Sequence, residues 1–357
     1  MKVALLLPEY PGCGPAFGIG RYAQILATGL IQRGHQVLIL AVTADGFHRV
    51  EGDSHQHQPA PPTCRGPMRP RIASSWISQQ LQAWQPDLIE ISNWGGLAAH
   101  LDAPAPMLCR ISSPIACHAL PGLAQRALKS WYHRNEQRSV MRSDRVVADS
   151  TIAASMCHAV YGRACDSVVH HGIDPEPSTH PDADAQDLLY LGRLESRKGI
   201  DRLLQAWPAV VAADPTRRLH IVGADPAGLA TVNSAASITF HGKVSDAEVQ
   251  AIKRRCLVQV IPSRFESFGL VVLEAWRDGL AIVATAGGAL PEVIADAGLV
   301  VHYDTQLAAT ISALLADPTQ MQQLATRGRE RLITDFSVDA FLTKTLSEYA
   351  QLVGSPP

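Results

Sequence analysis

Residues 262–292 constrain the fold of this chain more than any other stretch. An apolar run just before them, Leu257 to Ile261, has the length of a buried strand and ends at a Pro-Ser pair. A loop containing Gly269 follows, and then an apolar run with helical character. A strand, a glycine-bearing loop and a helix in this order direct free backbone N–H groups and the positive end of the helix dipole at an anion. We therefore expect an α/β domain that binds an anionic ligand, typically a phosphate, where the helix begins.

Two glutamates, Glu266 and Glu274, stand eight residues apart around this loop. If the first lies in the loop and the second two turns into the helix, a rise of about 1.5 Å per residue separates them by roughly 10 Å. That separation is at or beyond the upper limit for the paired carboxylates of a glycoside hydrolase. Two acids so placed can instead bracket an extended ligand, one at each end of a diphosphate.

Length and charge describe a two-domain protein and exclude a nucleic-acid binder. The chain has 357 residues, enough for two domains with separate cores, and a formal net charge of −2. Residues 1–172 carry 15 Lys and Arg against 11 Asp and Glu, and the remainder 16 against 22, so the halves come to +4 and −6. The basic excess of the first half fits an anionic acceptor or a membrane surface. It is too small and too dispersed to indicate binding to nucleic acid.

The seven cysteines are scattered along the chain and include no C-x-x-C pair. This pattern argues against a disulfide framework or a zinc site and for a reducing, cytoplasmic compartment. The first ten residues hold too short an apolar run for a signal peptide and have the pattern of a buried strand. No apolar stretch approaches the length of a transmembrane span.

The first 42 residues have the pattern of a βαβ unit, with a glycine-rich loop between the first strand and the helix. Gly18, Gly20 and Ala23 match the dinucleotide pattern G-x-G-x-x-[GA], and Asp45 follows the second strand. In a nicotinamide-binding fold, however, the first glycine directly follows the strand, whereas here ten residues intervene. An NAD(P)-dependent oxidoreductase therefore stays only as an alternative.

Two segments contain residue types that bind metals. Residues 43–70 are rich in Pro, Gly and His and have little periodicity, so we expect a long loop there. His55 and His57 form an H-x-H pair within it, but no carboxylate or cysteine framework supports a metal site. The D-x-D of Asp182 and Asp184 lies among prolines, in a segment with the composition of an interdomain linker. We predict no metal site in either segment.

Several motifs together resemble the retaining GT-B glycosyltransferases of glycosyltransferase family 4. The E-x7-E signature spans Glu266 to Glu274, and the GGALPEVI after it is similar to the family's GG-x-PE-[VI] segment. The run GRLESRKGID, which begins at Gly192, resembles the second signature, GRL-x3-KG-[IV]-D. The resemblance spans nearly the whole chain and is strongest from 188 to 300.

This resemblance implies an α/β fold of the GT-B type, in which two Rossmann-like domains with parallel sheets face each other across a cleft. The first domain, on the acceptor side, would comprise residues 1–174. A linker would follow at 175–187, and residues 188–337 would form the domain that holds the nucleotide-sugar donor. The last helix, at about 338–357, would pack back on the first domain.

The resemblance also implies roles for residues of the second domain. Glu266 would hold hydroxyls of the transferred sugar, and Glu274 the ribose. Arg193 and Lys198 would stabilise the negative charge that develops on the leaving nucleoside diphosphate, which fixed cationic side chains can do without a metal. The remaining donor-side candidates, among them the backbone amides at the helix start, are Gly269, Leu270, Phe268, Gly242, Lys243, Gly18 and Gly20.

On the first domain the chain departs from the family. Many members carry a histidine that contacts the donor sugar after the strand that here ends at 111, whereas this chain has a serine there and His118 only several residues later. Loops at the carboxyl ends of parallel strands line the ligand crevice of open α/β sheets. The acceptor-side candidates at two such strand ends are Asn93, Trp94, Ser112 and Ser113.

The implied reaction moves a sugar from a UDP-, GDP- or ADP-sugar to a hydroxyl of a sugar, lipid-linked or small-molecule acceptor, with retention at the anomeric carbon. We expect no cofactor and no metal requirement. A non-catalytic sugar-nucleotide-binding protein is the alternative that the missing histidine leaves open. A basic helix over 123–145 would allow a peripheral contact with the inner face of a membrane, although a solvated helix face is the more ordinary explanation.

Overall fold

The computed structural model describes residues 1–64, 66–117, 123–225, 228 and 235–354. It divides the chain into two compact units. Unit 1 consists of Met1–Gly172 and Val338–Pro357, and unit 2 of Ile173–Ser337. Residues 175–187, with the composition of a linker, thus belong to unit 2, where the backbone N–H of Ser178 donates to Asp278 at 3.1 Å.

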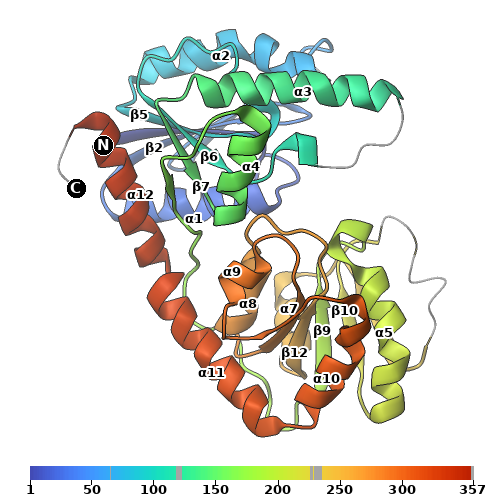
Figure 1. Cartoon of the computed structure of the whole chain (residues 1–357). Helices are drawn as coiled ribbons and strands as arrows, with labels where there is room; N and C mark the ends of the chain where they lie inside the picture. The colour runs from blue at the N-terminus through green and yellow to red at the C-terminus, as the bar shows by residue number, and fades with distance from the viewer. Residues whose placement is uncertain (65, 118–122, 226–227, 229–234, 355–357) are drawn as a thin grey trace. The chain divides into compact units, whose positions relative to one another are not determined.

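Unit 1 is built on an eight-stranded sheet in the order β4-β3-β2-β1-β5-β6-β7-β8 (Figure 1). The strands are β1 (Lys2–Leu7), β2 (Gln36–Val42), β3 (Gly46–Glu51), β4 (Ser54–Pro59), β5 (Leu88–Ser92), β6 (Met107–Ile111), β7 (Arg145–Ala148) and β8 (Ser167–Val168). The pairs β2–β3 and β3–β4 are antiparallel, and the other pairs are parallel. Because β2 and β5 flank β1 on opposite sides, the sheet is doubly wound, and its ligand edge is expected at the carboxyl ends of these strands.

Helices cover both faces of this sheet. They are α1 (Gly18–Gln32), α2 (Arg69–Trp84), α3 (Leu123–Met141), α4 (Thr151–Tyr161) and α12 (Val338–Val353), with short 3-10 turns η1 (Gly66–Met68), η2 (Trp94–Gly96) and η3 (Ile115–Cys117). Successive side chains of β1 point to opposite faces, as in any strand. Ala4 and Leu6 lie in a core with α2, α3 and α4, whereas Val3 and Leu5 lie in a second core with α1 and α12.

A buried ion pair ties α12 to the sheet of unit 1. Arg110 of β6 donates to Glu90 of β5 from Nε at 2.7 Å and from Nη2 at 3.2 Å, and both side chains are 1% exposed. From α12, the Tyr349 hydroxyl donates to Glu90 at 2.6 Å, and Thr345 Oγ1 lies 3.3 Å from Arg110 Nη2. Arg110, close to the position where many family members carry a histidine, is therefore a core residue.

The expectation of a long loop over residues 43–70 is wrong. The segment forms the β3–β4 hairpin and then the start of α2. Hydrophobic alternation in the sequence does not reveal the hairpin, because every residue of β4 is exposed. Its sequence signal is the Gly52-Asp53 pair between two short runs, since Gly followed by Asp is a turn dipeptide of tight hairpins. Gly52 has φ 55°, the left-handed region that such a turn requires.

Unit 2 contains a parallel six-stranded sheet in the order β11-β10-β9-β12-β13-β14. The strands are β9 (Asp187–Leu191), β10 (Leu219–Val222), β11 (Ile238–Gly242), β12 (Cys256–Ile261), β13 (Ala281–Thr285) and β14 (Leu299–Val301). The helices are α5 (Ile200–Ala213), α7 (Asp246–Lys253), α8 (Leu270–Arg277), α9 (Leu290–Ile294), α10 (Leu307–Leu315) and α11 (Pro318–Asp335), with the turns η4 (Ser196–Lys198) and η5 (Asp304–Gln306). In chain order, β10 and β11 are added on one side of β9, and β12, β13 and β14 are then added on its other side. The switch point, where open α/β sheets bind ligands, therefore lies between β9 and β12.

Within the part of the chain that the structure describes, no helix combines the length and the apolar character needed to cross a bilayer.

Candidate active site

The two loops that carry the glycosyltransferase-like signatures leave the sheet of unit 2 side by side. The first follows β9, the second follows β12, and these strands are neighbours with Leu189 opposite Gln259. A pocket at these strand ends is lined by Tyr190, Lys198, Ser263, Glu266 and Val271, among others. The signatures thus meet at the switch point although 68 residues separate Lys198 from Glu266.

The centre of the pocket is the carboxylate of Glu266, which is 6% exposed. Lys198 Nζ donates to its Oε1 at 2.7 Å, and Ser263 Oγ donates to the same oxygen at 2.7 Å. Arg197 Nη1 lies 3.9 Å from Oε2. Both donors engage one oxygen, so the second carboxylate oxygen is the one better placed to accept a hydrogen bond from a ligand hydroxyl.

Close backbone approaches hold these loops in place. Gly199 has φ 67°, and a Cβ there would lie 1.8 Å from the carbonyl oxygen of Pro262. Gly288 has φ 65°, and a Cβ there would lie 2.1 Å from the carbonyl oxygen of Glu266. That same oxygen accepts a hydrogen bond from Ala289 N at 2.9 Å. The glycines of both signatures therefore let the backbone pass directly against the Pro262–Glu266 loop.

Arg193 lies on the same loop as Lys198 but has different partners. Its side chain is 45% exposed, and Nη2 is 3.1 Å from Glu195 Oε1. Glu195 also lies 3.3 Å from Arg197 Nη2. Arg193, Arg197 and Lys198 thus bring three cationic side chains to this edge of the sheet. Cationic side chains grouped in this way suit a dianionic group such as a diphosphate.

Helix α8 begins directly after this loop. Its N-cap is Gly269 with φ 101°, and no described side chain caps this end. The first amides of the helix, those of Leu270 and Val271, therefore have no intrahelical acceptor and can bind an anion, whereas Val272 N donates to the Gly269 carbonyl at 2.9 Å. Phe268 is 2% exposed and packs edge-to-face on Phe336, with ring centroids 5.8 Å apart, so it fixes the entry into the helix. Glu274 lies half-buried on the second turn.

The other donor-side candidates are on a different strand of unit 2 or in unit 1. Gly242 ends β11 with φ 67°, and its carbonyl accepts from Gly223 N at 2.8 Å. Lys243 beside it is exposed. Gly18 and Gly20 lie in the first turn of α1 in unit 1.

The N-terminus of α1 differs from that of α8 because the chain supplies its own anion. The carboxylate of Glu9 accepts from Phe17 N at 2.9 Å and from Gly20 N at 2.8 Å. A dinucleotide fold would place its pyrophosphate at this helix start. A phosphate would have to displace Glu9, which disfavours the nicotinamide interpretation of Gly18 and Gly20.

The acceptor-side candidates in unit 1 form one hydrogen-bonded group. Asn93 is fully buried, and its Oδ1 accepts from Ser112 N at 3.0 Å. Its Nδ2 lies 3.3 Å from Tyr161 OH and 3.5 Å from the carbonyl oxygen of Ser113. Trp94, Ser112 and Ser113 are half-buried. Asn93 thus holds the loops after β5 and β6 together, and the less buried residues are better placed to meet a ligand. His118 lies outside the described residues.

Sequence reasoning missed Glu136, a fully buried carboxyl group on α3. It accepts from Gly95 N at 3.1 Å, from Ile115 N at 3.0 Å and from the Tyr161 hydroxyl at 2.7 Å. Burial raises its pKa to about 7, although these three hydrogen bonds act in the opposite direction. Among the arginines of a basic helix it resembled an ordinary solvated charge, and no local sequence signal identifies its role.

The two aspartates of the D-x-D segment stay a prediction as solvated linker residues. Asp182 and Asp184 are exposed in the segment before β9, and neither belongs to a group of potential ligands among the described residues.

Comparisons with known proteins agree with this architecture. Residues 17–177 match the family model described as Glycosyltransferase Family 4, and residues 185–317 match the one described as Glycosyl transferases group 1. A glycogen synthase of Mycobacterium tuberculosis is 26% identical over 396 residues, covering 98% of this chain and 94% of the relative.

Two solved structures show the same fold. The sucrose-phosphate synthase from Thermosynechococcus elongatus has a TM-score of 0.80 at 22% identity and covers 99% of both chains. Anabaena HepE in complex with UDP-glucose has a TM-score of 0.73 at 16% identity and covers 99% of this chain and 100% of the other. The fold is therefore the GT-B fold that the sequence predicted.

Proposed function

The chain belongs to glycosyltransferase family 4, and from that premise we propose that it moves a sugar from a nucleotide-diphosphate sugar to an acceptor hydroxyl, with retention at the anomeric carbon. Family membership makes it an enzyme of the glycosyltransferase class and decides against the non-catalytic binding protein and the NAD(P)-dependent oxidoreductase. The donor sugar, its base and the acceptor are parts of the proposal.

The observation that supports this proposal best is the group formed by Lys198, Ser263 and Glu266 at the switch point of unit 2. A sugar hydroxyl bound to Glu266 would leave the anomeric carbon close to the amides at the start of α8. The diphosphate would then lie between those amides and the ammonium of Lys198. Breakage of the sugar–phosphate bond increases the negative charge on the diphosphate, and preorganised cationic donors stabilise that charge in the transition state. Arg193 would contribute the second cation after leaving Glu195.

We propose that no metal is needed at the donor. The cationic side chains after β9 and the start of α8 would offset the diphosphate charge, and we assign no carboxylate the role of covalent nucleophile. Retention would follow if the leaving phosphate accepts the proton of the attacking hydroxyl on the face from which it departs. The other residues that would contact the donor are Glu274, Gly269, Leu270, Phe268, Gly242 and Lys243. On the acceptor side, Trp94, Ser112 and Ser113 are the candidates.

A screen of UDP-, GDP- and ADP-sugars by thermal shift tests the donor. A ligand that binds the native state raises the melting temperature by mass action, with about 2.7 kcal/mol of stabilisation at 100 times Kd. We expect one nucleotide to stand out, and we expect that shift to shrink in Lys198→Ala. NMR of the glycoside formed with the matching donor then reports the anomeric configuration. An inverted product would contradict the retaining mechanism.

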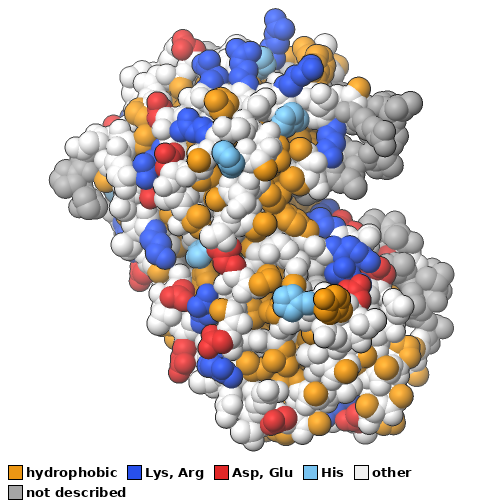
Figure 2. Space-filling model, viewed as in Figure 1, with side chains coloured by type: hydrophobic (Ala, Val, Ile, Leu, Met, Phe, Trp, Pro, Cys, Tyr) orange, Lys and Arg blue, Asp and Glu red, His pale blue; other side chains and the backbone are white. Residues whose placement is uncertain are grey.

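A peripheral membrane contact is a further part of the proposal. On α3, Trp131 is 49% and Leu128 is 40% exposed, and Arg134 and Arg138 are exposed with them. Figure 2 shows Lys and Arg side chains over the part of unit 1 where α2 and α3 lie. Co-sedimentation with vesicles of anionic lipid tests this contact. We expect binding that weakens in Trp131→Ala; equal recovery in the supernatant with and without vesicles would leave α3 as an ordinary solvated helix.

A further inference from the structure

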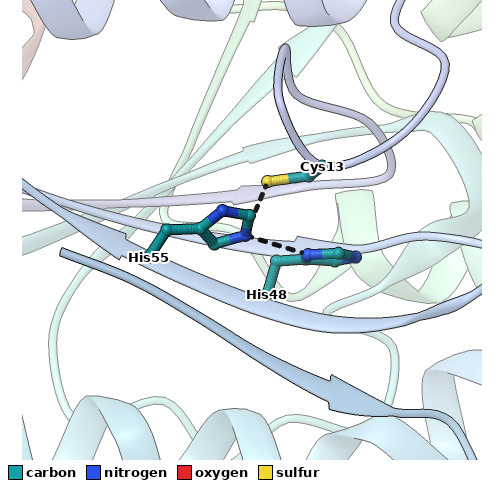
Figure 3. Close-up of side chains that lie close together, drawn as sticks. All are labelled: Cys13, His48 and His55. Carbon is teal, nitrogen blue, oxygen red and sulfur yellow. Dashed lines mark hydrogen bonds between the residues drawn. The ribbon is translucent and has the colours of Figure 1, made fainter. Parts of the chain in front are cut away.

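Three potential metal ligands from distant parts of the sequence meet in unit 1. Cys13 lies in the loop after β1, His48 on β3 and His55 on β4 (Figure 3). Cys13 Sγ is 3.7 Å from His55 Nε2, and His48 Nδ1 is 3.1 Å from the same nitrogen. The three ligand atoms all lie within 4.8 Å of one another. Cys13 is 1% and His48 3% exposed, whereas His55 is exposed.

These distances fit the ligand shell of a tetrahedral zinc ion. With Zn–S about 2.3 Å and Zn–N about 2.0–2.1 Å, a tetrahedral angle places sulfur and nitrogen about 3.6 Å apart and two nitrogens about 3.4 Å apart. The observed 3.7 Å and 3.1 Å differ from these values by only a few tenths of an ångström. The third distance, between the ligand atoms of Cys13 and His48, is at most 4.8 Å, so it would have to shorten by up to about 1.2 Å when an ion binds.

The surroundings of His48 select the correct nitrogen as the ligand. The Thr43 hydroxyl donates to Asp45 Oδ1 and therefore accepts from His48 Nε2, which is 3.0 Å away. Asp45 Oδ1 itself lies 3.5 Å from Nε2. With the proton on Nε2, the lone pair of Nδ1 faces Cys13 and His55. A carboxylate behind a ligating imidazole is the arrangement that orients histidines in zinc sites.

The hairpin holds both histidines on one face. His48 pairs with His57 across β3–β4, and His55 lies two residues from His57 on β4, so the three side chains point to the same side. The ring of His57 stacks on His48 with centroids 4.5 Å apart and fixes its orientation. The H-x-H pattern therefore supplies one ligand and one packing residue.

We propose that Cys13, His48 and His55 bind one Zn²⁺ ion, with Asp45 as the acceptor behind His48 and an exchangeable water in the fourth position. One thiolate and two imidazoles suit Zn²⁺ among the abundant divalent ions. Binding replaces the thiol proton of Cys13, which is released to solvent. The ion cross-links the loop after β1 to the β3–β4 hairpin and so fixes the segment that leads into α1. This site uses residues of unit 1 alone and none that line the pocket of unit 2, so the proposal stands whatever the donor is.

This zinc site cannot be recognised from sequence spacing, because the two histidines are 35 and 42 residues from Cys13 and follow no zinc-finger pattern. Only the pairing of β4 with β3, and the return of the loop after β1 over that hairpin, bring them together.

Titration of the metal-free, reduced full-length protein with Co²⁺ tests the site, because a cobalt–thiolate bond gives a charge-transfer band in the near ultraviolet. We expect this band to saturate at one equivalent and to disappear when Zn²⁺ is added. Zn²⁺ should also raise the melting temperature. Absence of a sulfur band in the wild-type protein would overturn the proposal.

Matched variants separate this site from chance binding at the surface. Cys13→Ser should abolish the band, while Cys117→Ser, which removes an exposed cysteine outside the cluster, should leave it unchanged. Asp45→Asn should weaken binding by about 10- to 100-fold, as loss of a partner behind a ligand does. His57→Gln should still bind one equivalent of Co²⁺. Circular dichroism checks that each variant folds. A band that survives in Cys13→Ser, or equal Zn²⁺ affinity in Asp45→Asn and wild type, would refute the proposed ligand set.

Discussion

At the scale of single residues, the two oxygens of Glu266 have different surroundings. Oε1 accepts from both Lys198 and Ser263, whereas the nearest cation to Oε2 is Arg197 at 3.9 Å. A ligand hydroxyl can bind Oε2 without disturbing the contact that holds Lys198. In the proposed reaction Glu266 would connect the sugar to the cation that receives the leaving diphosphate.

We predict that Glu266→Ala abolishes transfer and leaves unit 2 folded. The change removes the contact to the reacting sugar and leaves Lys198 without its partner. Steady-state kinetics should show kcat/KM reduced by more than tenfold, a loss above about 1.4 kcal/mol. An unchanged circular dichroism spectrum is the control for the fold. If the variant kept more than a tenth of the wild-type kcat/KM, Glu266 would not belong to the catalytic site.

The cations on the loop after β9 lead to a second prediction. Arg193→Ala and Lys198→Ala should each lower kcat by roughly 100-fold or more, as loss of one preorganised donor does. Because both cations serve one leaving group, the fold loss of kcat in the double variant should be smaller than the product of the two single losses.

The matched control is Arg327→Ala on α11. Its guanidinium lies 3.8 Å from exposed Asp296, and neither residue lines the pocket. An exposed pair contributes at most about 1 kcal/mol, so kcat should change less than about fivefold. Strictly multiplicative losses in the Arg193–Lys198 cycle would show that the two cations act in separate places.

At the level of secondary-structure elements, helix α3 binds two loops of unit 1 through the carboxyl group of Glu136. Glu136 accepts from Gly95 in η2 and from Ile115 in η3, which follow neighbouring strands β5 and β6. Asn93 joins the same loops through Ser112. The acceptor-side candidates Trp94, Ser112 and Ser113 are therefore positioned by buried polar groups.

The titration of Glu136 predicts a pH dependence of stability. Burial raises its pKa to about 7, while an unfolded glutamate titrates near about 4.3. Between these values the folded protein binds more protons than the unfolded chain, so the contribution of Glu136 to stability falls as the pH rises toward 7. Glu136→Gln removes this titration.

Melting temperatures of wild type and Glu136→Gln between about pH 4.5 and 7.5 test this linkage. The difference in melting temperature in favour of the wild type over Glu136→Gln should decrease steadily as the pH rises. Glu330→Gln, at an exposed position of α11, should show a constant difference. A constant difference for Glu136→Gln as well would contradict the raised pKa.

Two glycines of unit 2 have similar φ angles but different surroundings. Replacing each by alanine therefore separates the destabilisation caused by a close backbone contact from that caused by backbone strain. Gly288→Ala should destabilise the protein more than Gly242→Ala, although their φ angles are 65° and 67°. Both substitutions strain the backbone by about 1–3 kcal/mol. Only at Gly288 would the new Cβ also meet the carbonyl oxygen of Glu266, whereas nothing lies within 4 Å at Gly242. Chemical denaturation measures both variants, and equal losses would mean that the contact at Gly288 relaxes freely.

At the scale of the whole molecule, the proposed reaction places no metal at the donor, while unit 1 holds the proposed zinc site. We predict that EDTA does not lower the activity of Cys13→Ser, in which zinc can no longer bind, and that Mg²⁺ or Mn²⁺ does not raise it. The reason is that Lys198, Arg193 and the start of α8 already offset the diphosphate charge.

The same assay on the wild-type protein is the comparison. A loss of activity with EDTA in wild type alone would report on the zinc site. A loss in Cys13→Ser that Mg²⁺ or Mn²⁺ reverses would show a metal at the donor, and Asp182 and Asp184 would then be the first residues to replace.

The sequence alone was enough to predict the α/β class, the GT-B fold and the glycosyltransferase family, and it proposed the residues of a donor site. These follow from local signals: buried strands are short apolar runs, and the glycines and charges after β9 and β12 stand at fixed positions in their loops. Strand order within each sheet is not contained in such signals, and only the structure shows it. The family resemblance nevertheless assigned Lys198 and Glu266 to one site before their 2.7 Å contact was seen.

The tertiary structure alone decided the features that depend on polar contacts between distant segments. The strand β4 has no buried residue, so hydrophobic periodicity could not reveal it. Glu136 differs from a solvated glutamate only through donors 41 and 21 residues away. Cys13, His48 and His55 become one cluster only when the hairpin is paired and the loop after β1 folds over it. A polar residue in a sequence carries no sign of which donor or ligand will face it, because that is fixed by the packing of the elements around it.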